Sequence, residues 1–314
     1  MKILVTGAHG FIGSAIARRY AALGHEGHGF DHRAQPFRSV TDWAAIERAM
    51  EDFKPDVVSH HAANVDIQRA IDDPGSDAHA NVVGTAIVAT AAVKYGVKRL
   101  IYASSSSCYG QQDVQPVSET AIPQPLNPYG WSKYAGEFYA RRHGNAVIFR
   151  YGNVYGPGQS ISDRGVIGIF ARQLLAGEQP TIFGDALHDY IYIDDVVDAN
   201  VRALACEPAT MNIGSGTGTS TSEILALVQA ALDIPTTPRR QPAQRGTYDH
   251  MVLDASLARS VMGWKPQWSL ESGIAQVCRW VSRWVRQFFL QLPLGPMNKD
   301  DLTRYLNQCI GRLP

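Results

Sequence analysis

Short apolar runs alternate with segments of helical periodicity along the first half of the chain. The apolar runs lie at residues 2–6, 27–31, 55–60, 99–103 and 146–151. Apolar positions recur at helical spacing in 11–23, 43–53, 77–95 and the segment after Pro128. Such runs predict buried strands, and such spacing predicts amphipathic helices. The alternation predicts an α/β fold of the Rossmann type, with a doubly wound parallel sheet between two layers of helices.

The pattern loosens after about residue 154, where glycine and proline recur and the elements become short. Helices are predicted at 194–205 and 222–232. We therefore expect a first domain over 1–154 plus about 186–205. A smaller α/β C-terminal lobe is expected over about 155–185 and 206–285, followed by a tail extension at 286–314.

An apolar face at helical spacing runs from Trp280 to Phe289, and a Pro/Gly break at 293–296 separates it from a short helix predicted at 299–310. Two interpretations stay open. The segment is either a closing helix that packs on the fold or an additional oligomer contact.

The composition is that of an ordinary globular protein, with 45% hydrophobic and 18% charged residues and a formal net charge of zero. Neither a nucleic acid nor an acidic membrane surface is indicated as a partner. The four cysteines are far apart, which argues against a zinc site or a disulfide framework, and the ten histidines show no metal-binding spacing. No signal peptide or membrane-spanning run is recognisable, so we expect a cytoplasmic location.

A glycine-rich turn lies where the first strand meets the first helix. Gly7, Gly10 and Gly13 would allow a tight turn, close approach of the backbone to a pyrophosphate, and close packing of the helix on the sheet. Asp31 follows 18 residues after Gly13, at the end of the second strand, where its carboxylate would bind ribose hydroxyls and repel a 2′-phosphate. This pattern predicts NAD rather than NADP, although Arg33 weakens that preference. The alternative is a structural glycine turn beside a surface aspartate.

Tyr129 and Lys133 stand at i and i+4, so both would lie on one face of the predicted helix. A protonated lysine beside a phenol favours the phenolate, and such a phenol can act as a general acid or base at a carbinol. The serine run 104–107 follows a predicted strand, at the edge of the sheet where ligands bind. Taken separately, the pair could be a surface pair and the serines a polar loop.

These motifs together resemble the extended short-chain dehydrogenase/reductases, and among them the nucleotide-sugar epimerases of the UDP-galactose 4-epimerase type. The resemblance runs from residue 1 to about 285. Besides the glycines, Asp31, the serine run and the Tyr/Lys pair, it rests on segments 60–63, 73–74, 81–85, 150–157, 182–185, 189–190, 194–195 and 211–214.

The resemblance implies a role for each matching residue. Tyr129 would be the acid/base, Lys133 its pKa-lowering partner, and Ser105 the third catalytic residue. The cofactor positions are Gly7, Gly10, Phe11, Ile12, Gly13, Asp31, His61, Ala62, Ala63, Asn81, Ser104, Tyr129, Lys133 and Tyr151. The substrate positions are Ser105, Ser106, Asn153, Phe183, His188 and Arg245.

The implied activity is an NAD-dependent 4-epimerase of a nucleotide sugar, such as a UDP-hexose, that oxidises carbon 4 and returns the hydride to the other face. The alternative is a dehydrogenase or reductase of a sugar or another small hydroxy compound. A dehydratase is disfavoured because Ser106 and Ser107 stand where that class carries acids. The resemblance also implies a homodimer formed through the helix at 77–95 and the helix of Tyr129.

Three positions depart from the family pattern. His188 replaces an arginine that pairs with the substrate diphosphate, and Gln244, followed by Arg245, stands at a second arginine position. Either Arg245 and a protonated His188 cover the diphosphate, or the substrate is not a usual nucleotide sugar. Gly152 replaces a bulky aromatic residue and is expected to open space beside the nicotinamide or the sugar.

Overall fold

The computed structural model describes residues 1–33, 38–162 and 165–289, with side chains through Val285. The chain divides into two compact units. Unit 1 comprises Met1–Val154, Ala186–Gly218 and Gln244–Gln267, and unit 2 comprises Tyr155–Asp185, Thr219–Ala243 and the chain from Trp268 onward.

Unit 1 is built on a six-stranded sheet in the order β2-β1-β3-β4-β5-β9, in which every neighbouring pair is parallel. Its strands are β1 (Lys2–Thr6), β2 (Glu26–Phe30), β3 (Val57–His60), β4 (Arg99–Ser105), β5 (Ala146–Tyr151) and β9 (Thr210–Ile213). The chain moves from β1 to β2 in one direction and continues with β3 on the other side of β1. The strand order therefore reverses between β1 and β3, where ligands bind at the carboxyl ends of the strands.

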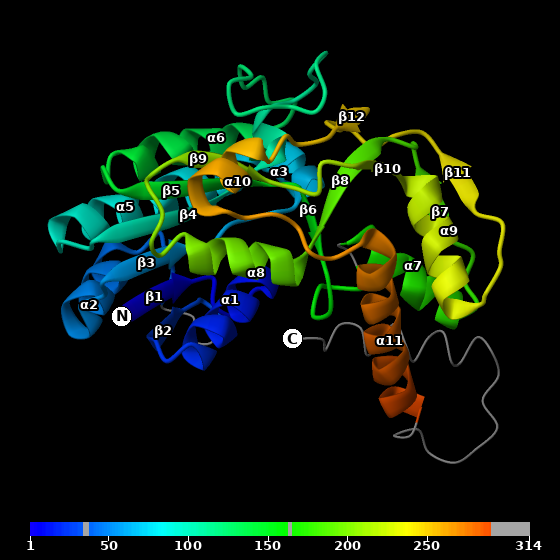
Figure 1. Ribbon diagram of the computed structural model, residues 1–314, viewed down its shortest axis with the longest axis horizontal. Coiled ribbons are helices and arrows are strands. Elements are labelled where there is room, and N and C mark those ends of the chain that lie inside the picture. Colours follow the sequence, from blue (N-terminus) through cyan, green and yellow to red (C-terminus); the bar gives the residue numbers. More distant parts are fainter. Residues whose placement is uncertain (34–37, 163–164, 290–314) are drawn as a thin grey trace. The chain divides into compact units, whose positions relative to one another are not determined.

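Helices cover both faces of this sheet, as Figure 1 shows. The helices α2 (Trp43–Phe53), α5 (Gly84–Lys94) and α6 (Pro128–Arg141) lie on one face, and α1 (Phe11–Ala22) packs with α8 (Ile193–Arg202) on the other. Between the first layer and the sheet, Leu4, Ile46, Val58, Val88 and Leu100 are completely buried. The predicted Rossmann-type fold class is confirmed.

The helix predicted over 77–95 is divided into three parts. α4 (Pro74–Ala78) is followed by a π-helical turn at His79–Val83 and then by α5, and the unpredicted α3 (Ile67–Asp72) precedes them. The turn carries Asn81, whose Nδ2 donates to the Asn64 carbonyl at 2.9 Å and to the Ser132 hydroxyl at 3.0 Å. A π turn inserts one residue into the helix, a feature that is frequent at functional sites.

Two segments predicted for the second lobe belong to unit 1. β9 pairs with β5, which places residues 206–218 with the main sheet. β12 (His250–Met251) pairs with β8 (Leu187–Tyr192), which places 244–267 there as well, including α10 (Ser256–Met262). Both strands are too short to give a periodic pattern in the sequence. β6 (Asn153–Tyr155) and β10 (Gly218–Ser220) run across the boundaries between the units.

Unit 2 contains α7 (Val166–Leu175), α9 (Thr221–Leu232) and α11 (Leu270–Phe289), with β7 (Thr181–Phe183) paired to β11 (Arg239–Gln241). α11 packs against α7 and α9 and buries Ile274, Val277 and Val281. The described part of the tail is thus a closing helix. The helix predicted at 299–310 lies outside the described residues.

A buried ion-pair cluster joins α6 to β4 and β5. Glu137 is completely buried, and its two carboxylate oxygens accept Arg150 Nε and an Arg150 terminal nitrogen, each at 2.8 Å. The Ser104 hydroxyl and Arg141 also donate to it, both at 2.7 Å. Burial alone would raise the pKa of Glu137, but the bonds and charge of Arg150 outweigh it and hold the pKa below its usual value.

Replacing Glu137 with glutamine should lower the free energy of unfolding by about 3–5 kcal/mol, because Arg150 then stays buried without a counter-charge. Urea unfolding followed by circular dichroism measures this. Glu51→Gln, which removes an exposed carboxylate bonded to Tyr95, should cost under about 1 kcal/mol. Since the pKa of Glu137 is lowered, its contribution should disappear as the pH falls through that pKa. Equal losses in the two variants would contradict a structural role for the cluster.

Candidate active site

The predicted glycine turn lies at the reversal of the strand order. Gly7 adopts φ +69°, and its N–H donates to the Phe30 carbonyl at 2.9 Å. A Cβ atom on Gly7 would stand 2.7 Å from the Ala62 nitrogen, and one on Gly13 would overlap the carbonyl oxygen of Gly7. The turn therefore excludes side chains at both positions, as the sequence predicts.

The groups around this turn fit a dinucleotide. The N-terminus of α1, with Phe11 and Ile12 in its first turn, has no side-chain cap, so its N–H groups can face a pyrophosphate. Asp31 is buried at the end of β2, where its carboxylate accepts the backbone N–H groups of His9 at 3.0 Å and Arg33 at 2.8 Å. The carboxylate is held in place beside the glycine turn, which is the arrangement that ribose recognition requires.

The segment after β3 forms the opposite side of the same edge. The Ala62 N–H donates to Thr6 Oγ1 at 3.3 Å, while His61 Nε2 meets the Ser59 hydroxyl at 2.9 Å. Burial lowers the pKa of His61 to about 3, so its ring is neutral, and its Nδ1 has no hydrogen-bond partner among the described residues. Ala63 follows in this loop, and Asn81 is buried next to it and bonded to Asn64.

The four serines after β4 have different partners. The Ser104 hydroxyl is buried against Glu137, and Ser105 Oγ accepts the Ser107 backbone N–H at 3.1 Å. The Ser105 side chain also acts on Tyr129, where it opposes the rise in the pKa of the phenol. Ser106 and Ser107 are buried, and their side chains act on Tyr248 in the same way. Only Ser105 of the run is thus directed to the predicted catalytic phenol.

The start of α6 fixes Tyr129 and Lys133. Asn127 caps the helix, with its Oδ1 accepting the Gly130 N–H at 2.8 Å, and Pro128 occupies the first turn. A Cβ atom on Gly130 would overlap the carbonyl oxygen of Ser107, so this glycine allows the helix to approach the serine turn. Tyr129 reaches Ser105 from the first turn, and Lys133 follows one turn later.

The electrostatics of this pair differ from the sequence-based expectation. Burial raises the pKa of Tyr129 well above its usual value, and only the Ser105 side chain lowers it appreciably. Lys133 is buried, which lowers its pKa from 10.5 to about 8, and its ammonium lies 4.5 Å from the centroid of the Tyr102 ring. Desolvation of the phenolate therefore outweighs the predicted effect of Lys133 in this structure, although Lys133 stays a cation at pH 7.

Three predicted site residues lie in different surroundings. The Tyr151 hydroxyl is buried on the side of α8, where it accepts Asn200 Nδ2 at 2.8 Å. Asn153 bonds to the Tyr190 side chain, and Phe183 is 46% exposed on β7 of unit 2. Their predicted roles stay predictions. Gly152 opens no space, because a Cβ atom there would stand 2.8 Å from the Asp189 carbonyl oxygen.

His188 is not the cation that was considered above. Burial lowers its pKa to about 4, so it is neutral at pH 7, and its Nδ1 has no partner among the described residues. Its ring packs edge-on against Tyr190 and Tyr248, with centroid distances of 6.3 and 5.4 Å. Arg245 is exposed and paired with Asp72 at 2.8 Å. Substrate binding by either residue stays a prediction.

Sequence reasoning missed two aromatic residues of this region. Tyr102 lies beneath the Lys133 ammonium, and Tyr248 reaches Ser106 and Ser107 from a loop more than 130 positions later in the chain. Tyr102 could have been noticed as an aromatic residue on the strand that ends at the serines. No spacing in the sequence relates Tyr248 to them.

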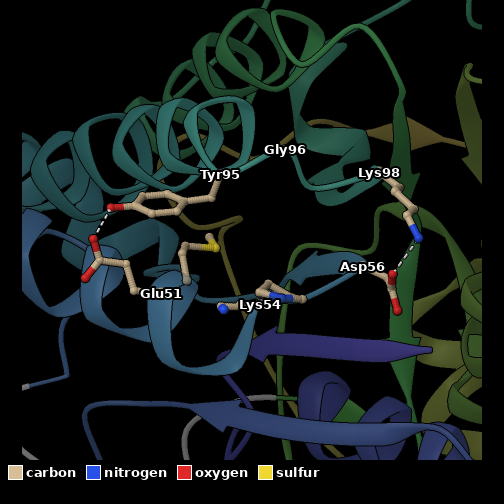
Figure 2. A pocket seen from close by; sticks show the side chains of 8 residues that line it. Glu51, Lys54, Asp56, Tyr95, Gly96 and Lys98 are labelled. Atoms are coloured by element: carbon tan, nitrogen blue, oxygen red, sulfur yellow. Dashed lines mark hydrogen bonds and ion pairs between the residues drawn. The ribbon is translucent and has the colours of Figure 1, made fainter.

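A cavity of about 440 Å³ lies away from these residues, at the amino ends of the strands of the main sheet (Figure 2). Its lining includes Lys54, Pro55 and Asp56 before β3 and Gly96 and Lys98 before β4. These are the amino ends of the strands, whereas ligands of such sheets bind at the carboxyl ends. Four of its polar side chains bond within the lining, Tyr95 to Glu51 and Lys98 to Asp56. Among the described residues, no group of His, Cys, Asp and Glu side chains is placed to hold a metal ion.

The fold is that of a dinucleotide-binding α/β enzyme, and the predicted Ser105, Tyr129 and Lys133 group lies at the carboxyl ends of its strands. Comparison with known proteins makes the class specific. The model of the NAD dependent epimerase/dehydratase family matches residues 3–214, and the chain belongs to this family. The family predicted from the sequence is confirmed.

Individual relatives agree with this assignment. The UDP-glucose 4-epimerase of Mycolicibacterium smegmatis is 39% identical over 303 residues, covering 88% of this chain and 97% of that protein. The crystal structure of Thermotoga maritima UDP-glucose 4-epimerase with UDP-glucose is 33% identical, with a TM-score of 0.87 and coverage of 91% and 100%. That of the Thermus thermophilus enzyme with NAD is 32% identical, with a TM-score of 0.83 and coverage of 90% and 99%.

Replacing Gly13 with alanine should reduce NAD affinity by about tenfold or more, because the new Cβ forces the first turn of α1 away from Gly7. Calorimetric titration with NAD, together with the NAD content of the purified protein, measures this. Gly27→Ala is the matched control, since a Cβ on that glycine of β2 meets nothing within 4 Å. Unchanged NAD binding in a folded Gly13 variant would refute the assigned site.

Proposed function

We propose that this protein inverts carbon 4 of a UDP-hexose, with NAD as its cofactor. The observation that carries the proposal is the position of Tyr129 in the first turn of α6, where Ser105 lowers its pKa and Lys133 follows one turn further along the helix. This group lies at the carboxyl edge of the same sheet as the glycine turn. The relatives confirm the prediction of an NAD-dependent nucleotide-sugar 4-epimerase, while the hexose and the roles of individual residues are our proposals.

The chain's own residues move one proton out and back. Tyr129 acts as the base once it is ionised against the desolvation that raises its pKa. It then takes the proton of the sugar 4-hydroxyl, and the Ser105 hydroxyl donates a hydrogen bond to the same oxygen. NAD, held by the glycine turn and Asp31, would supply the reversible hydride acceptor that inversion at carbon 4 needs. Tyr129 then returns its proton to the 4-oxygen, so no proton or electron is consumed overall. The Lys133 cation stabilises the phenolate during both proton transfers.

We assign the dinucleotide to unit 1, and we keep the prediction that Phe183 of unit 2 contacts a nucleobase. Unit 1 supports this with the uncapped end of α1, the buried Asp31 and the Asn81 segment. Unit 2 contributes Phe183, whose exposed ring on β7 offers a flat apolar surface on which a nucleobase can stack.

A second candidate function is net oxidation or reduction of a small hydroxy compound. It is favoured by the neutral state of His188, which cannot pair with a diphosphate as a cation would. The two functions differ in their products. An epimerase regenerates its cofactor, whereas a dehydrogenase accumulates NADH.

Incubating the protein with UDP-glucose should give UDP-galactose, which NMR detects through the signal of the proton on carbon 4. The NADH absorbance should show no steady rise. Tyr129→Phe should reduce kcat by about 10²–10⁴-fold, because the general base is lost. NAD binding and the circular dichroism spectrum should be retained.

Tyr134→Phe is the matched control, since it removes a phenol from the same helix whose ring lies beside Trp131, and it should keep wild-type turnover. A Tyr129→Phe variant with full activity would refute the mechanism. Steady NADH formation from an alcohol, without inversion of any nucleotide sugar, would favour the second candidate.

We also propose that the protein is a cytoplasmic homodimer that associates through α5 and α6. Val93 on α5 and Trp131 and Phe138 on α6 are exposed by 54%, 54% and 60%, and the two helices pack side by side. Apolar side chains gathered in this way are typical of an association surface. The described cysteines, Cys108, Cys206 and Cys278, are all free thiols, which suits a reducing compartment. No described helix is long and apolar enough to cross a membrane.

Phe138→Glu should convert the dimer to a monomer, because it buries an unpaired charge in the interface. Sedimentation equilibrium measures the mass. Ile122→Glu, at a 73% exposed position outside both helices, should leave the dimer intact. A wild-type monomer at micromolar concentration, or a dimeric Phe138 variant, would overturn the assigned interface.

A further inference from the structure

The ammonium group of Lys133 is held against an aromatic ring. Its nitrogen lies 4.5 Å from the centroid of the Tyr102 ring, and only 3% of the lysine is exposed. A cation over the face of an aromatic ring is attracted by the ring's quadrupole, most strongly where water is excluded. Tyr102 belongs to β4, three residues before Ser105, so the strand that presents the catalytic serine also supports the lysine.

The carboxylates near Lys133 do not supply an alternative anchor. Lys133 forms no ion pair with any described residue. Glu137, four positions along α6, is occupied by Arg150, Arg141 and Ser104. Asp77 on α4 accepts Asn81 Nδ2 at 3.1 Å through Oδ1, and its Oδ2 makes no hydrogen bond with a described residue. Both carboxylates act on Lys133 only through space.

The Tyr102 ring cannot easily move away. It is completely buried, and its hydroxyl donates to the Lys133 backbone carbonyl at 3.3 Å. A Cβ atom on Gly136 would overlap that hydroxyl, so α6 is closed down onto it. The His60 ring lies 5.7 Å away by centroids and is itself fixed between Thr6 at 2.6 Å and Thr85 at 3.0 Å.

We propose that Tyr102 is a positioning residue for the catalytic lysine: the face of its ring keeps the buried Lys133 ammonium charged and aimed at the reaction site. This inference rests on the proposed function and adds a residue to it. Tyr102 acts through Lys133 and does not contact the reacting atoms.

The other groups that face Lys133 come from four elements. They are Asp77 of α4, Glu137 and Tyr129 of α6, Cys108 of the turn after β4, His60 at the end of β3, and His61, which follows it. Burial lowers the pKa of both histidines and raises that of Cys108, so these three are neutral near pH 7. The Tyr102 ring, with its centroid 4.5 Å from the ammonium, is therefore the group whose contact with the cation we test.

The test compares Tyr102→Leu with Tyr102→Phe in the holoenzyme, using kcat and kcat/KM for UDP-glucose from pH 6 to 10. The pKa of Lys133 is about 8, so the cation is lost on the alkaline side. Without the Tyr102 ring, the alkaline limb of the pH profile of kcat should move down by about one pH unit. KM should change by less than about threefold. Tyr102→Phe keeps the aromatic ring, so its alkaline limb should lie at the wild-type pH even if its absolute kcat differs.

Leu100→Ala controls for an unspecific cavity, since it truncates a fully buried residue of the same strand and should leave the limb in place. If Tyr102→Leu does not fold, Tyr102→Met replaces it as a longer apolar side chain. A folded variant without the ring that keeps the wild-type limb overturns the proposal. If the alkaline limb of Tyr102→Phe shifts as far as that of Tyr102→Leu, the proposal is also overturned, because the Tyr102 hydroxyl and not its ring would then hold the pKa of Lys133.

A direct titration separates this inference from the proposed function. The ¹³Cε signal of Lys133, assigned by comparison with Lys133→Met, reports the lysine pKa without any turnover. A lower pKa in Tyr102→Leu but not in Tyr102→Phe supports the positioning role even if no nucleotide sugar is inverted. Equal pKa values in the three proteins refute it even if epimerase activity is present.

Discussion

Burying the ammonium of Lys133 is the constraint on which the site depends. A fall in its pKa from 10.5 to about 8 corresponds to roughly 3 kcal/mol that the folded protein must supply to keep the cation at neutral pH. The fold supplies it by closing α6 onto β4. Two glycines of α6 make this approach possible, because a Cβ atom on Gly130 would meet Ser107 and one on Gly136 would meet Tyr102. The helix therefore carries glycines where an exposed helix would favour alanine.

The same close approach orders the serine run. Glu137 projects from α6 into the sheet, binds Arg150 of β5 and fixes the hydroxyl of Ser104. With Ser104 held inward, the alternation of side chains along the end of β4 turns Ser105 toward Tyr129. A buried ion pair is seldom the most stabilising choice, and hydrophobic residues of similar volume often serve better. Its geometric effect here is to fix which serine meets the phenol.

What the sequence could predict followed from local patterns. The strands of the main sheet, the glycine turn with Asp31, and the Tyr129/Lys133 spacing are all encoded within short windows, and the structure has each near its predicted position. The π turn at Asn81 could not be predicted, because it depends on Asn64 and Ser132 from other segments. The domain boundaries were misjudged since β9 and β12 are short strands that return to unit 1. His188 is neutral because it is buried, and the Tyr248 ring beside it comes from a distant segment that only the fold brings there.

His188 and Arg245, the two residues considered for the diphosphate, can now be separated by the free energy that each needs to act as a cation. With a pKa of about 4, His188 would need roughly 4 kcal/mol to carry a proton at pH 7, and its contacts are with aromatic rings. Arg245 is already a cation, and its pair with Asp72 is exposed, with 67% and 66% of the two side chains accessible. Exposed pairs of this kind contribute about 0–1 kcal/mol, so a phosphate can replace Asp72 at little cost. Of the two, Arg245 is therefore the better candidate for pairing with a diphosphate, while the His188 ring packs against Tyr248.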